Sequence, residues 1–443
     1  MNRLRGCIPL FFYKWIIKVQ CVDYALKYRL FPDSQQREQL DWVRDTLRQL
    51  YNHALHRFNR IPESAGTVKQ RVQKARDEIP ALKDWWTDLT NVYSTVLQQA
   101  VEQIATNIEN LGKLKENGFD VGSLNWKAPH EYRSFTYRQR GFELDEKSGP
   151  TGRGTLTLKK VNGDTIDVPI RLHRPIPDDT DIKHVTVKKD RTGAWYACLS
   201  VDQDEAENPE PGEINTEDTV GIDLGICNFI YDSDGRQIGR PDLSADRDRL
   251  EREQRNLSRK EHGSTNWENQ RQTVAEVHKR MQDKKRDFKH KVAAFYTREY
   301  DAVFVEDLNV KGMLEGDRNG RNTHEVGWRD FITILKHHGR KRGCHVIEVD
   351  PEDTTKACNQ CGVQTEKPLW VREHSCPSCG FETDRDYNAA LNVWERGLRT
   401  LGVVHSKETP AETGTAVDTA AVSASAVVET GSPCLKEPAL AGE

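Results

Sequence analysis

Alternating apolar and polar positions over 24–30 predict a strand, and Pro32 ends this pattern because proline cannot donate to a strand ladder. Apolar side chains then recur three to five positions apart, the spacing of an amphipathic helix that begins after the capping residues Asp33 and Ser34. The helical patterns in this part of the chain cover 35–58, about 68–77 and about 91–114. A helical module therefore interrupts a β element.

Strand patterns return after the helical module, and two pairs of strands are joined by residues typical of hairpin turns, at 162–164 and 190–193. These patterns cover 133–144, 154–172 and 184–201. Together with the first strand, they predict a small β-barrel.

The second half of the chain mixes strongly apolar strands with helices. The predicted strands cover 219–230, a segment after the turn at 232–235, then 302–305 and 345–349. The predicted helices cover 252–291, 327–342 and 386–396. An acidic stretch with two prolines, 202–218, separates the two halves and predicts a solvated linker.

Charge is distributed unevenly along the 443 residues, which suffice for two to four domains. The formal net charge is −4, but 202–218 carries eight acids and no base, and 407–443 carries a further −4. The remaining body therefore has a charge of +8, which is compatible with a polyanionic partner. Mean hydropathy is −0.77 and no apolar run reaches about 20 residues, so no membrane span is expected.

The first residues and the cysteines bear on the compartment. Residues 8–19 are mostly apolar and could act as a short signal peptide, but Lys14 and Lys18 interrupt them and no small-residue cleavage site follows. We expect 1–21 to be a non-native or disordered extension instead. Six of the ten cysteines are scattered singly, unlike a secreted disulfide framework, which favours a reducing compartment.

The other four cysteines form two C-x-x-C pairs separated by fourteen residues, close to the spacing of a zinc ribbon. Each pair supplies two thiolates from one tight turn, and a glycine follows each pair. Four sulfur ligands complete a tetrahedral Zn²⁺ site, which is then structural because no position is left for water. The alternative is a set of buried or redox-active thiols. The predicted zinc ligands are Cys358, Cys361, Cys376 and Cys379.

Three carboxylates interrupt or follow buried-type segments. Asp223 lies within an apolar strand, Glu306 directly follows another, and Asp386 opens a helix, where it could be an ordinary N-cap. Each acid alone has a structural explanation. Together, two acids at strand positions and a third at a helix start are typical of ribonuclease H-like nucleases, which hold two Mg²⁺ ions at a phosphodiester.

The chain resembles TnpB, the OrfB-type family of bacterial and archaeal insertion sequences, which is similar to the type V CRISPR effector nucleases. The resemblance extends over about 24–398. Its most specific part is the block of four cysteines followed by the motif at 384–392. The other matching motifs lie at 28–32, 51–55, 221–225, 263–267 and 305–310.

This resemblance implies an RNA-guided DNA endonuclease with a split RuvC-like domain. It assigns Asp223, Glu306 and Asp386 as catalytic ligands of two Mg²⁺ ions, with Asp307 and Asp384 as the nearest competing assignments. The implied partners are a transposon-encoded guide RNA and double-stranded DNA with a short flanking motif. The implied location is the prokaryotic cytoplasm, at the nucleoid.

The expected fold is multidomain, α+β and α/β: a β-barrel interrupted by a helical module, then a ribonuclease H-like (RuvC) domain with an inserted zinc ribbon. The expected domains are the extension (1–21), a wedge-like barrel (22–32 and 126–201), a helical recognition module (33–125), the acidic linker (202–218), the nuclease domain (219–350 and 386–400), the zinc ribbon (351–385) and a disordered tail (401–443).

The predicted helix 252–291 has twelve basic residues against six acids. Its cations could contact nucleic acid, or they could form a solvated face paired with nearby acids at i, i+4. The family resemblance favours nucleic-acid contact. The predicted contact residues are Lys279, Arg280, Lys284, Lys285, Arg286 and Lys289.

Two other functions compete with a guided nuclease. A nuclease-inactive nucleic-acid-binding protein, acting as a guided DNA binder or regulator, is disfavoured because all three acids are present. A strand transferase with a tyrosine nucleophile needs paired metal-binding histidines. His337 and His338 are adjacent and point in different directions on a helix, so this chemistry is not expected.

Overall fold

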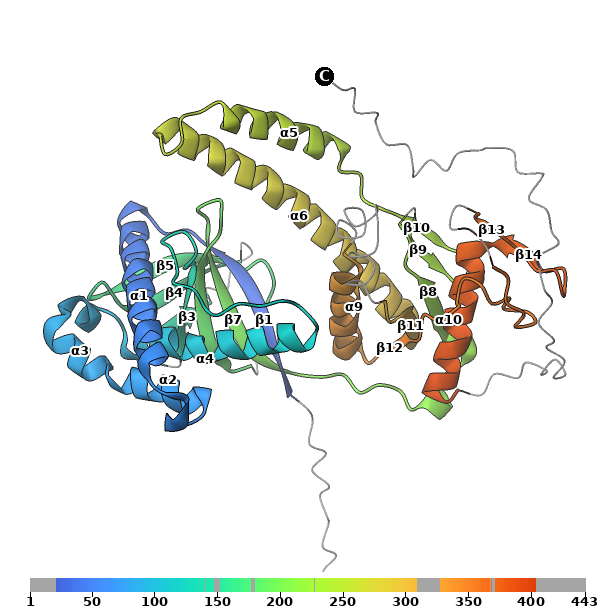
Figure 1. The fold of residues 1–443 in the computed structure, drawn as a ribbon, viewed down its shortest axis with the longest axis horizontal. Helices are drawn as coiled ribbons and strands as arrows, with labels where there is room; N and C mark the ends of the chain where they lie inside the picture. Colours follow the sequence, from blue (N-terminus) through green and yellow to red (C-terminus); the bar gives the residue numbers. More distant parts are fainter. Residues whose placement is uncertain are drawn as a thin grey trace, which may run out of the picture. The chain divides into compact units, whose positions relative to one another are not determined.

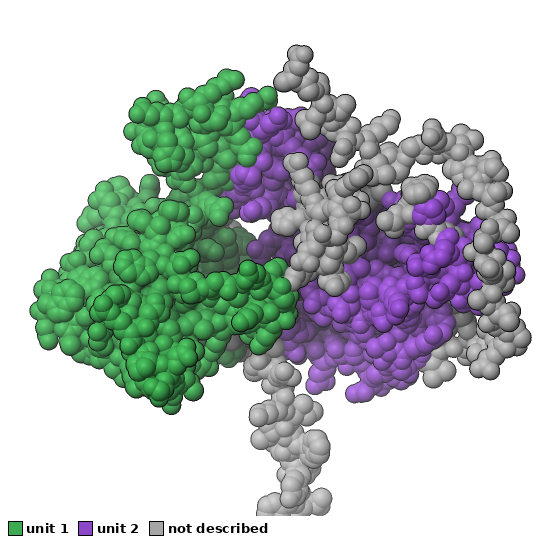
Figure 2. All heavy atoms as spheres, viewed as in Figure 1, with its two compact units in different colours: residues 1–204, 253–276 green, residues 205–252, 277–443 purple. Residues whose placement is uncertain are grey.

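The computed structural model describes residues 21–138, 140–146, 152–176, 180–226, 228–308, 327–366, 368 and 371–403. The predicted extension and tail lie almost entirely outside these residues. The chain divides into two compact units, residues 1–204 with 253–276 and residues 205–252 with 277–443 (Figure 2). Within the described ranges, no helix has the length and apolar character needed to cross a membrane.

The first unit contains a seven-stranded antiparallel sheet in the order β2-β6-β7-β1-β5-β4-β3, with helices packed against it (Figure 1). Its strands are β1 (Cys21–Leu30), β2 (Ser134–Arg138), β3 (Phe142–Asp145), β4 (Arg153–Val161), β5 (Asp164–Arg171), β6 (Ile182–Lys189) and β7 (Trp195–Asp204). Its helices are α1 (Ser34–Arg60), η1 (Glu63–Ala65), α2 (Val68–Asp77), α3 (Ile79–Trp85), η2 (Thr87–Asn91) and α4 (Ser94–Glu116).

The sheet is nearly closed, as the barrel prediction requires. Its edge strands β2 and β3 are consecutive in the chain, and Lys159 of β4 joins them by donating its N–H to the Gly141 carbonyl (3.0 Å) and accepting the Tyr137 hydroxyl (3.2 Å). The predicted strand region 133–144 contains both edge strands, because the chain turns between β2 and β3. Buried side chains of the strands and of α1, α2 and α4 form one continuous core.

Local signals explain why α1 begins where it does. The Asp33 carboxylate accepts the Gln36 N–H (2.8 Å), and the Gln36 side chain accepts the Asp33 N–H (3.1 Å). This capping box satisfies two backbone groups that a helix start leaves without partners. The predicted cap and the amphipathic helix after it are thus confirmed.

The second unit contains a five-stranded sheet in the order β10-β9-β8-β11-β12, in which β8, β11 and β12 are parallel and β9 and β10 are antiparallel to their neighbours. Its strands are β8 (Thr219–Asp223), β9 (Asn228–Asp232), β10 (Gln237–Gly239), β11 (Ala302–Glu306) and β12 (His345–Val349), with a separate hairpin of β13 (Glu373–Ser375) and β14 (Glu382–Asp384). Its helical elements are η3 (Pro211–Glu213), η4 (Thr216–Asp218), α5 (Ser244–Ser258), α6 (Thr265–Glu299), α9 (Trp328–Arg342) and α10 (Arg385–Leu401). Residues 253–276, which include the end of α5 and the start of α6, belong to the first unit.

Two predicted elements of this half are corrected. The predicted strand 219–230 is two antiparallel strands, β8 and β9, because the chain reverses after Asp223. The predicted helix 252–291 is a pair, α5 and α6, broken at 259–264. The Ser264 hydroxyl accepts the Trp267 N–H (3.2 Å) there and caps the start of α6.

The acidic segment 202–218 is largely exposed, as predicted, but it does not lie free of the fold. Strand β7 continues to Asp204, and the Ala206 N–H then donates to the Arg340 carbonyl of α9 (3.0 Å). The Pro209 carbonyl lies 2.8 Å from His345 Nε2 of β12. The acidic residues thus keep water around their charges while the backbone of the segment bonds to the second unit.

The five-stranded sheet is covered by helices on both faces. Side chains of α6 and α9 pack on one face, and α10 packs on the other, where Figure 1 shows it in red beside β8. The approach of α10 is close: a methyl group added at Gly221 of β8 would overlap the α10 backbone, and one added at Gly397 of α10 would overlap the Phe304 ring. Two glycines therefore allow the helix to lie directly on the sheet.

Candidate metal and carboxylate site

The four predicted zinc ligands lie together in the second unit. Their sulfur atoms all lie within 4.8 Å of one another. Cys358 Sγ and Cys379 Sγ are 3.7 Å apart, and Cys361 Sγ and Cys376 Sγ are 3.5 Å apart. A tetrahedral site with Zn–S bonds of about 2.3 Å has sulfur atoms about 3.8 Å apart, so the cluster fits this ion. Among the residues that the structure describes, it is the only such group of His, Cys, Asp or Glu.

Both cysteine pairs have the same backbone geometry, which explains the fit. The Gly362 N–H donates to the Cys358 carbonyl (2.8 Å), and the Gly380 N–H donates to the Cys376 carbonyl (2.9 Å). Both glycines are left-handed, with φ of 77° and 74°, a conformation that other residues rarely adopt. Each pair is therefore one tight knuckle that directs two sulfur atoms to a common centre.

The strand pattern places Glu306 on the face of the sheet that α10 covers. Along β11, Val303 and Val305 belong to the core on the α9 face, whereas Ala302 and Phe304 belong to the core on the α10 face. Side chains alternate between the faces of a strand, so Glu306 follows Phe304 onto the α10 face. The Glu306 side chain is 5% exposed.

Asp223 occupies the matching position on the neighbouring strand. Strands β8 and β11 are parallel, and Ile222 pairs with Val305, so the next position along each strand is Asp223 on one and Glu306 on the other. Partner residues in a parallel pair point to the same face. Asp223 is 7% exposed, and the two acids therefore lie side by side at the carboxyl ends of adjacent strands.

Helix α10 brings Asp386 to the same end of the sheet. Trp394 Nε1, in the second half of α10, donates to Thr219 Oγ1 at the first residue of β8 (2.8 Å). Since α10 runs antiparallel to β8, its first turn lies at the other end of the strand, where Asp223 is. Asp386 belongs to that first turn, and its side chain is 13% exposed.

The three carboxylates lie near enough for their charges to affect one another. Burial, followed by the negative charges of Glu306 and Asp386, raises the pKa of Asp223 well above its ordinary value. Burial also raises the pKa of Glu306, although a hydrogen bond from the Thr354 hydroxyl (2.5 Å) opposes this effect. Asp223 and Glu306 are buried and Asp386 is partly buried, so their negative charges repel one another unless cations compensate them.

Two arginines provide part of that compensation. Arg372 Nη1 lies 3.0 Å from Asp386 Oδ2, and Arg385 Nη2 lies 3.1 Å from Asp386 Oδ1. Both guanidinium groups also lower the pKa of Asp223, against the effects that raise it. As placed, therefore, Asp386 is neutralised by arginines and Glu306 is held by a hydroxyl.

The two competing acids have other roles. The Asp384 carboxylate accepts the backbone N–H groups of Asp386 (2.8 Å) and Tyr387 (3.3 Å), so it is the N-cap of α10. The expectation that Asp386 could be an ordinary N-cap is thus wrong. The Asp307 side chain is 61% exposed and pairs with Arg329.

Three family models match parts of the chain. Models of the OrfB type match residues 197–316, described as "Probable transposase", and 22–63, described as "Helix-turn-helix domain". A "Cas12f1-like, TNB domain" model matches residues 328–393. A putative RNA-guided DNA endonuclease of Streptomyces pristinaespiralis is 32% identical over 388 residues, which cover 86% of this chain and 90% of the relative. The chain belongs to the TnpB family.

Two further likenesses extend over most of this TnpB-family chain. The putative RNA-guided DNA endonuclease InsQ of Escherichia coli K12 is 24% identical over 401 residues, or 85% of this chain and 93% of the relative. A Cas12f1 chain, solved in a complex with single-guide RNA and target DNA, covers 84% of this chain and 99% of its own length. Its TM-score is 0.55 at 13% identity, so this likeness concerns the fold.

Most of the six cations predicted to bind nucleic acid have partners within this TnpB-family chain. Arg280 and Lys284 of α6 pair with the buried Asp246 of α5. Lys279 pairs with Asp283 (2.9 Å) in the next turn. These ion pairs join α5 to α6 and successive turns of α6, which gives the three cations a structural role. Their binding of nucleic acid stays a prediction.

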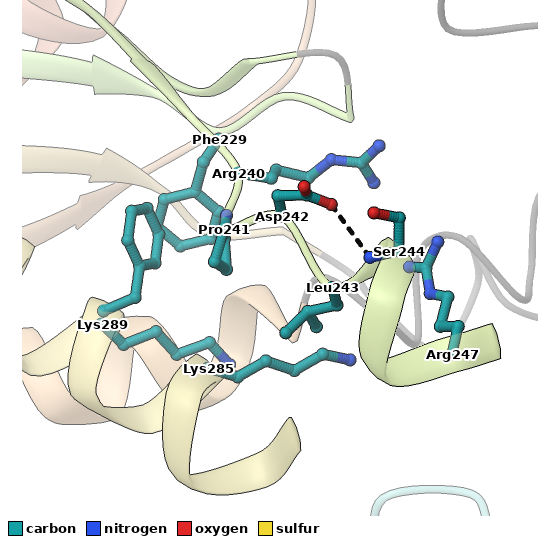
Figure 3. A pocket seen from close by; sticks show the side chains of 10 residues that line it. Phe229, Arg240, Pro241, Asp242, Leu243, Ser244, Arg247, Lys285 and Lys289 are labelled. Atoms are coloured by element: carbon teal, nitrogen blue, oxygen red, sulfur yellow. Dashed lines mark hydrogen bonds between the residues drawn. The ribbon is translucent and has the colours of Figure 1, made fainter. Parts of the chain in front are cut away.

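The other three predicted cations have different surroundings. Lys289 is buried and bonds to the Asp330 carboxylate (3.0 Å) and the Gly327 carbonyl (2.9 Å). Arg286 Nε lies 3.4 Å from His290 Nε2. Lys285 lines a cavity beside α5 (Figure 3). The six cations that lie close together in the sequence therefore differ in the structure: some form ion pairs with acids of the chain, and Lys285 lines a cavity.

Sequence reasoning missed the polar residues that join the cysteine knuckles to α10. Asn388 Nδ2 donates to the Ala357 carbonyl and Asn392 Nδ2 to the Thr354 carbonyl, both at 2.8 Å. The Asn359 N–H donates to Asn388 Oδ1 (3.0 Å). Two asparagines four positions apart lie on one helix face, within the motif that marks the family, and this spacing was the available signal. No sequence signal identified Thr354.

Proposed function

We propose that this TnpB-family chain is an RNA-guided, Mg²⁺-dependent DNA endonuclease encoded by an insertion sequence. The observation that carries the proposal is the grouping of two buried acids, Asp223 and Glu306, with the partly buried Asp386 at one end of a sheet, where their charges interact. Two relatives that match most of the chain are named putative RNA-guided DNA endonucleases. The order of the five-stranded sheet, with three parallel and two antiparallel strands, supports a ribonuclease H-like fold for this unit.

The proposed catalytic ligands are Asp223, Glu306 and Asp386. Carboxylate oxygens are the ligands that Mg²⁺ prefers, and the buried, mutually repelling charges favour a divalent cation. Two bound ions would activate the attacking water and stabilise the leaving oxygen of a phosphodiester. When Asp386 turns to a cation, Arg372 and Arg385 become available to hold the phosphate of the substrate.

The four cysteines are proposed to hold a structural Zn²⁺ ion. The first knuckle bonds to α10 through Asn388, and the segment just before it bonds to α10 through Asn392 and donates the Thr354 hydroxyl to Glu306. One short segment, 354–359, therefore touches both the helix that carries Asp386 and the carboxylate of Glu306. The zinc ribbon supports the geometry of the acidic site.

Substituting Thr354 with valine tests this support, because valine keeps the shape of threonine and removes the hydroxyl. A hydrogen bond to a charged group contributes about 1.5–3 kcal/mol, so the cleavage rate is expected to fall by about 10-fold or more. The Mg²⁺ concentration for half-maximal cleavage should rise, and zinc content should stay the same. These quantities are measured by cleavage titrations and metal analysis.

Thr365 offers a matched control for this experiment. Its hydroxyl is buried and makes no hydrogen bond within the described part of the chain. Thr365→Val is therefore expected to leave the Mg²⁺ dependence unchanged. Equal behaviour of the two variants would exclude a positioning role for Thr354.

The proposed partners are a transposon-encoded guide RNA and a double-stranded DNA target. To test the function, the full chain is expressed with its flanking non-coding DNA, and the RNA that co-purifies is sequenced. A plasmid library with the matching target beside randomised positions is then incubated with the complex and Mg²⁺. We expect cleavage only of plasmids that carry the target and one short flanking motif. Bound but uncut plasmids would establish the alternative, a nuclease-inactive guided DNA binder.

A further inference from the structure

Two tyrosines lie beside the proposed catalytic acids of the second unit. Tyr231 of β9 pairs with Asp223 of β8 in the antiparallel ladder, and such partners point to the same face with their Cβ atoms about 4.5–5.5 Å apart. Tyr387 directly follows Asp386 in the first turn of α10. The ring centroids of the two tyrosines are 5.6 Å apart, and the ring planes are inclined by 41°. Each tyrosine is thus next to one acid, and the two rings contact each other.

The strand order places this tyrosine pair at one end of the acids. Along β9-β8-β11, the positions that lie side by side on the α10 face are Tyr231, Asp223 and Glu306. Neighbouring strands are about 4.8 Å apart, so this row is about 10 Å long. Helix α10 packs over β8 and β9 on the same face (Figure 1). A phosphodiester bound at the acids therefore has the two rings about one strand spacing away.

Neither tyrosine belongs to an apolar core of this unit. Other side chains form the core on the α9 face and the core on the α10 face. Tyr231 and Tyr387 are both partly exposed. Tyr296 of α6 is different, since it is fully buried in the core on the α9 face and donates its hydroxyl to Asp232 (2.8 Å). Two partly exposed rings in contact can pack against a further flat ring.

A nucleic-acid base fits the chemistry of this tyrosine pair. Bases stack on aromatic side chains irrespective of sequence, because every base has a π-face. In a duplex the neighbouring bases cover those faces, so a base becomes accessible only after it leaves the stack. We propose that Tyr231 and Tyr387 bind the unstacked base next to the scissile phosphate, and that they thereby select an unwound DNA strand over an intact duplex. This inference rests on the proposed nuclease function and names the form of DNA that its site takes.

The first arm of the test measures single-turnover cleavage by the full chain with its guide RNA. The cut positions are mapped from the product ends, and an abasic site is then placed at each position that flanks a cut. We expect one abasic position to slow the parent protein by about 5-fold or more, as the loss of one stacked base does. Tyr387→Leu should slow cleavage of the intact target by a similar factor and should be insensitive to that abasic position. Target binding should be unchanged, because pairing with the guide dominates it.

Two variants serve as controls for Tyr387→Leu. Tyr387→Phe keeps the ring and should cut within about 3-fold of the parent rate. Phe295→Leu removes an exposed ring from α6, which packs on the other face of the sheet, and should also cut within about 3-fold. An abasic scan without effect, or losses from Tyr387→Leu and the abasic site that multiply, would overturn the inference.

The second arm does not depend on cleavage. Without Mg²⁺, the complex is irradiated with target DNA in which 5-iodouracil, which crosslinks to neighbouring aromatic rings, replaces thymine. We expect a crosslink to Tyr231 or Tyr387, located by mass spectrometry, with a target that matches the guide. An equal crosslink with an unmatched duplex would overturn the selection of an unwound strand. The matched crosslink in a complex that fails to cut with Mg²⁺ would contradict the nuclease proposal alone, whereas cleavage without any crosslink to these tyrosines would contradict this inference alone.

Discussion

Asp223→Asn, Glu306→Gln and Asp386→Asn are each expected to lower guided DNA cleavage by about 1,000-fold or more. Each change keeps the shape of the side chain and removes one charge, and a two-ion site loses the arrangement of both ions when one ligand fails. Guide-RNA binding should be retained. Cleavage is measured in single-turnover reactions over a range of Mg²⁺ concentrations, and RNA binding by filter retention.

Protein stability separates this effect from misfolding. Because the pKa of Asp223 is raised in the folded chain, its ionised form lowers stability as the pH rises. Asparagine removes that cost, so metal-free Asp223→Asn should melt at the same temperature as the parent protein or higher at neutral pH.

The raised pKa of Asp223 also predicts a pH dependence of cleavage. Lowering the pH should raise the Mg²⁺ requirement of the parent protein, because a protonated Asp223 cannot bind a cation.

Asp307→Asn is the control for the three acids, because Asp307 is adjacent to Glu306 but largely exposed. It is expected to cut DNA within about 3-fold of the parent rate, the scale of a surface change of about 0.5 kcal/mol. Loss of cleavage in Asp307→Asn together with activity in Glu306→Gln would mean that the catalytic assignment is wrong by one position.

Cys361→Ser is expected to release the zinc and also to abolish cleavage. Binding of a structural Zn²⁺ ion contributes about 10–16 kcal/mol in small modules, so its loss should unfold both knuckles. Since Asn388 and Asn392 bond to the first knuckle, the first turns of α10 should then exchange their amide hydrogens faster. Metal analysis and hydrogen exchange over 354–359 and 385–392 measure the two effects.

Cys198→Ser is a suitable comparison, because Cys198 lies on β7 in the first unit and outside the cysteine cluster. It should retain stoichiometric zinc and slow exchange in α10. Purified parent protein without stoichiometric zinc would contradict the metal assignment. Zinc loss with unchanged exchange in α10 would contradict the proposed support of the acidic site.

The sequence determined those features that depend on local order. Period-two alternation predicted β1, and Asp33 with the apolar positions after it predicted α1, because capping and amphipathicity act within a few residues. The cysteine spacing predicted the cluster for the same reason, since each knuckle closes within five residues. Asp223 and Glu306 stood out because each carboxylate lies in or directly after an apolar strand, whereas Asp386 was assigned through the resemblance to TnpB.

Only the tertiary structure decided which charges meet. The parallel register places Asp223 beside Glu306, and Gly221 with Gly397 lets α10 lie on the sheet, although these residues are far apart in the chain. The basic pattern of α6 could not separate structural cations from those that face a cavity, because the partner Asp246 comes from another helix. Patterns in the sequence report interactions between residues a few positions apart. Which side chains pair across the fold depends on how distant elements pack, and the spacing along the sequence does not specify that packing.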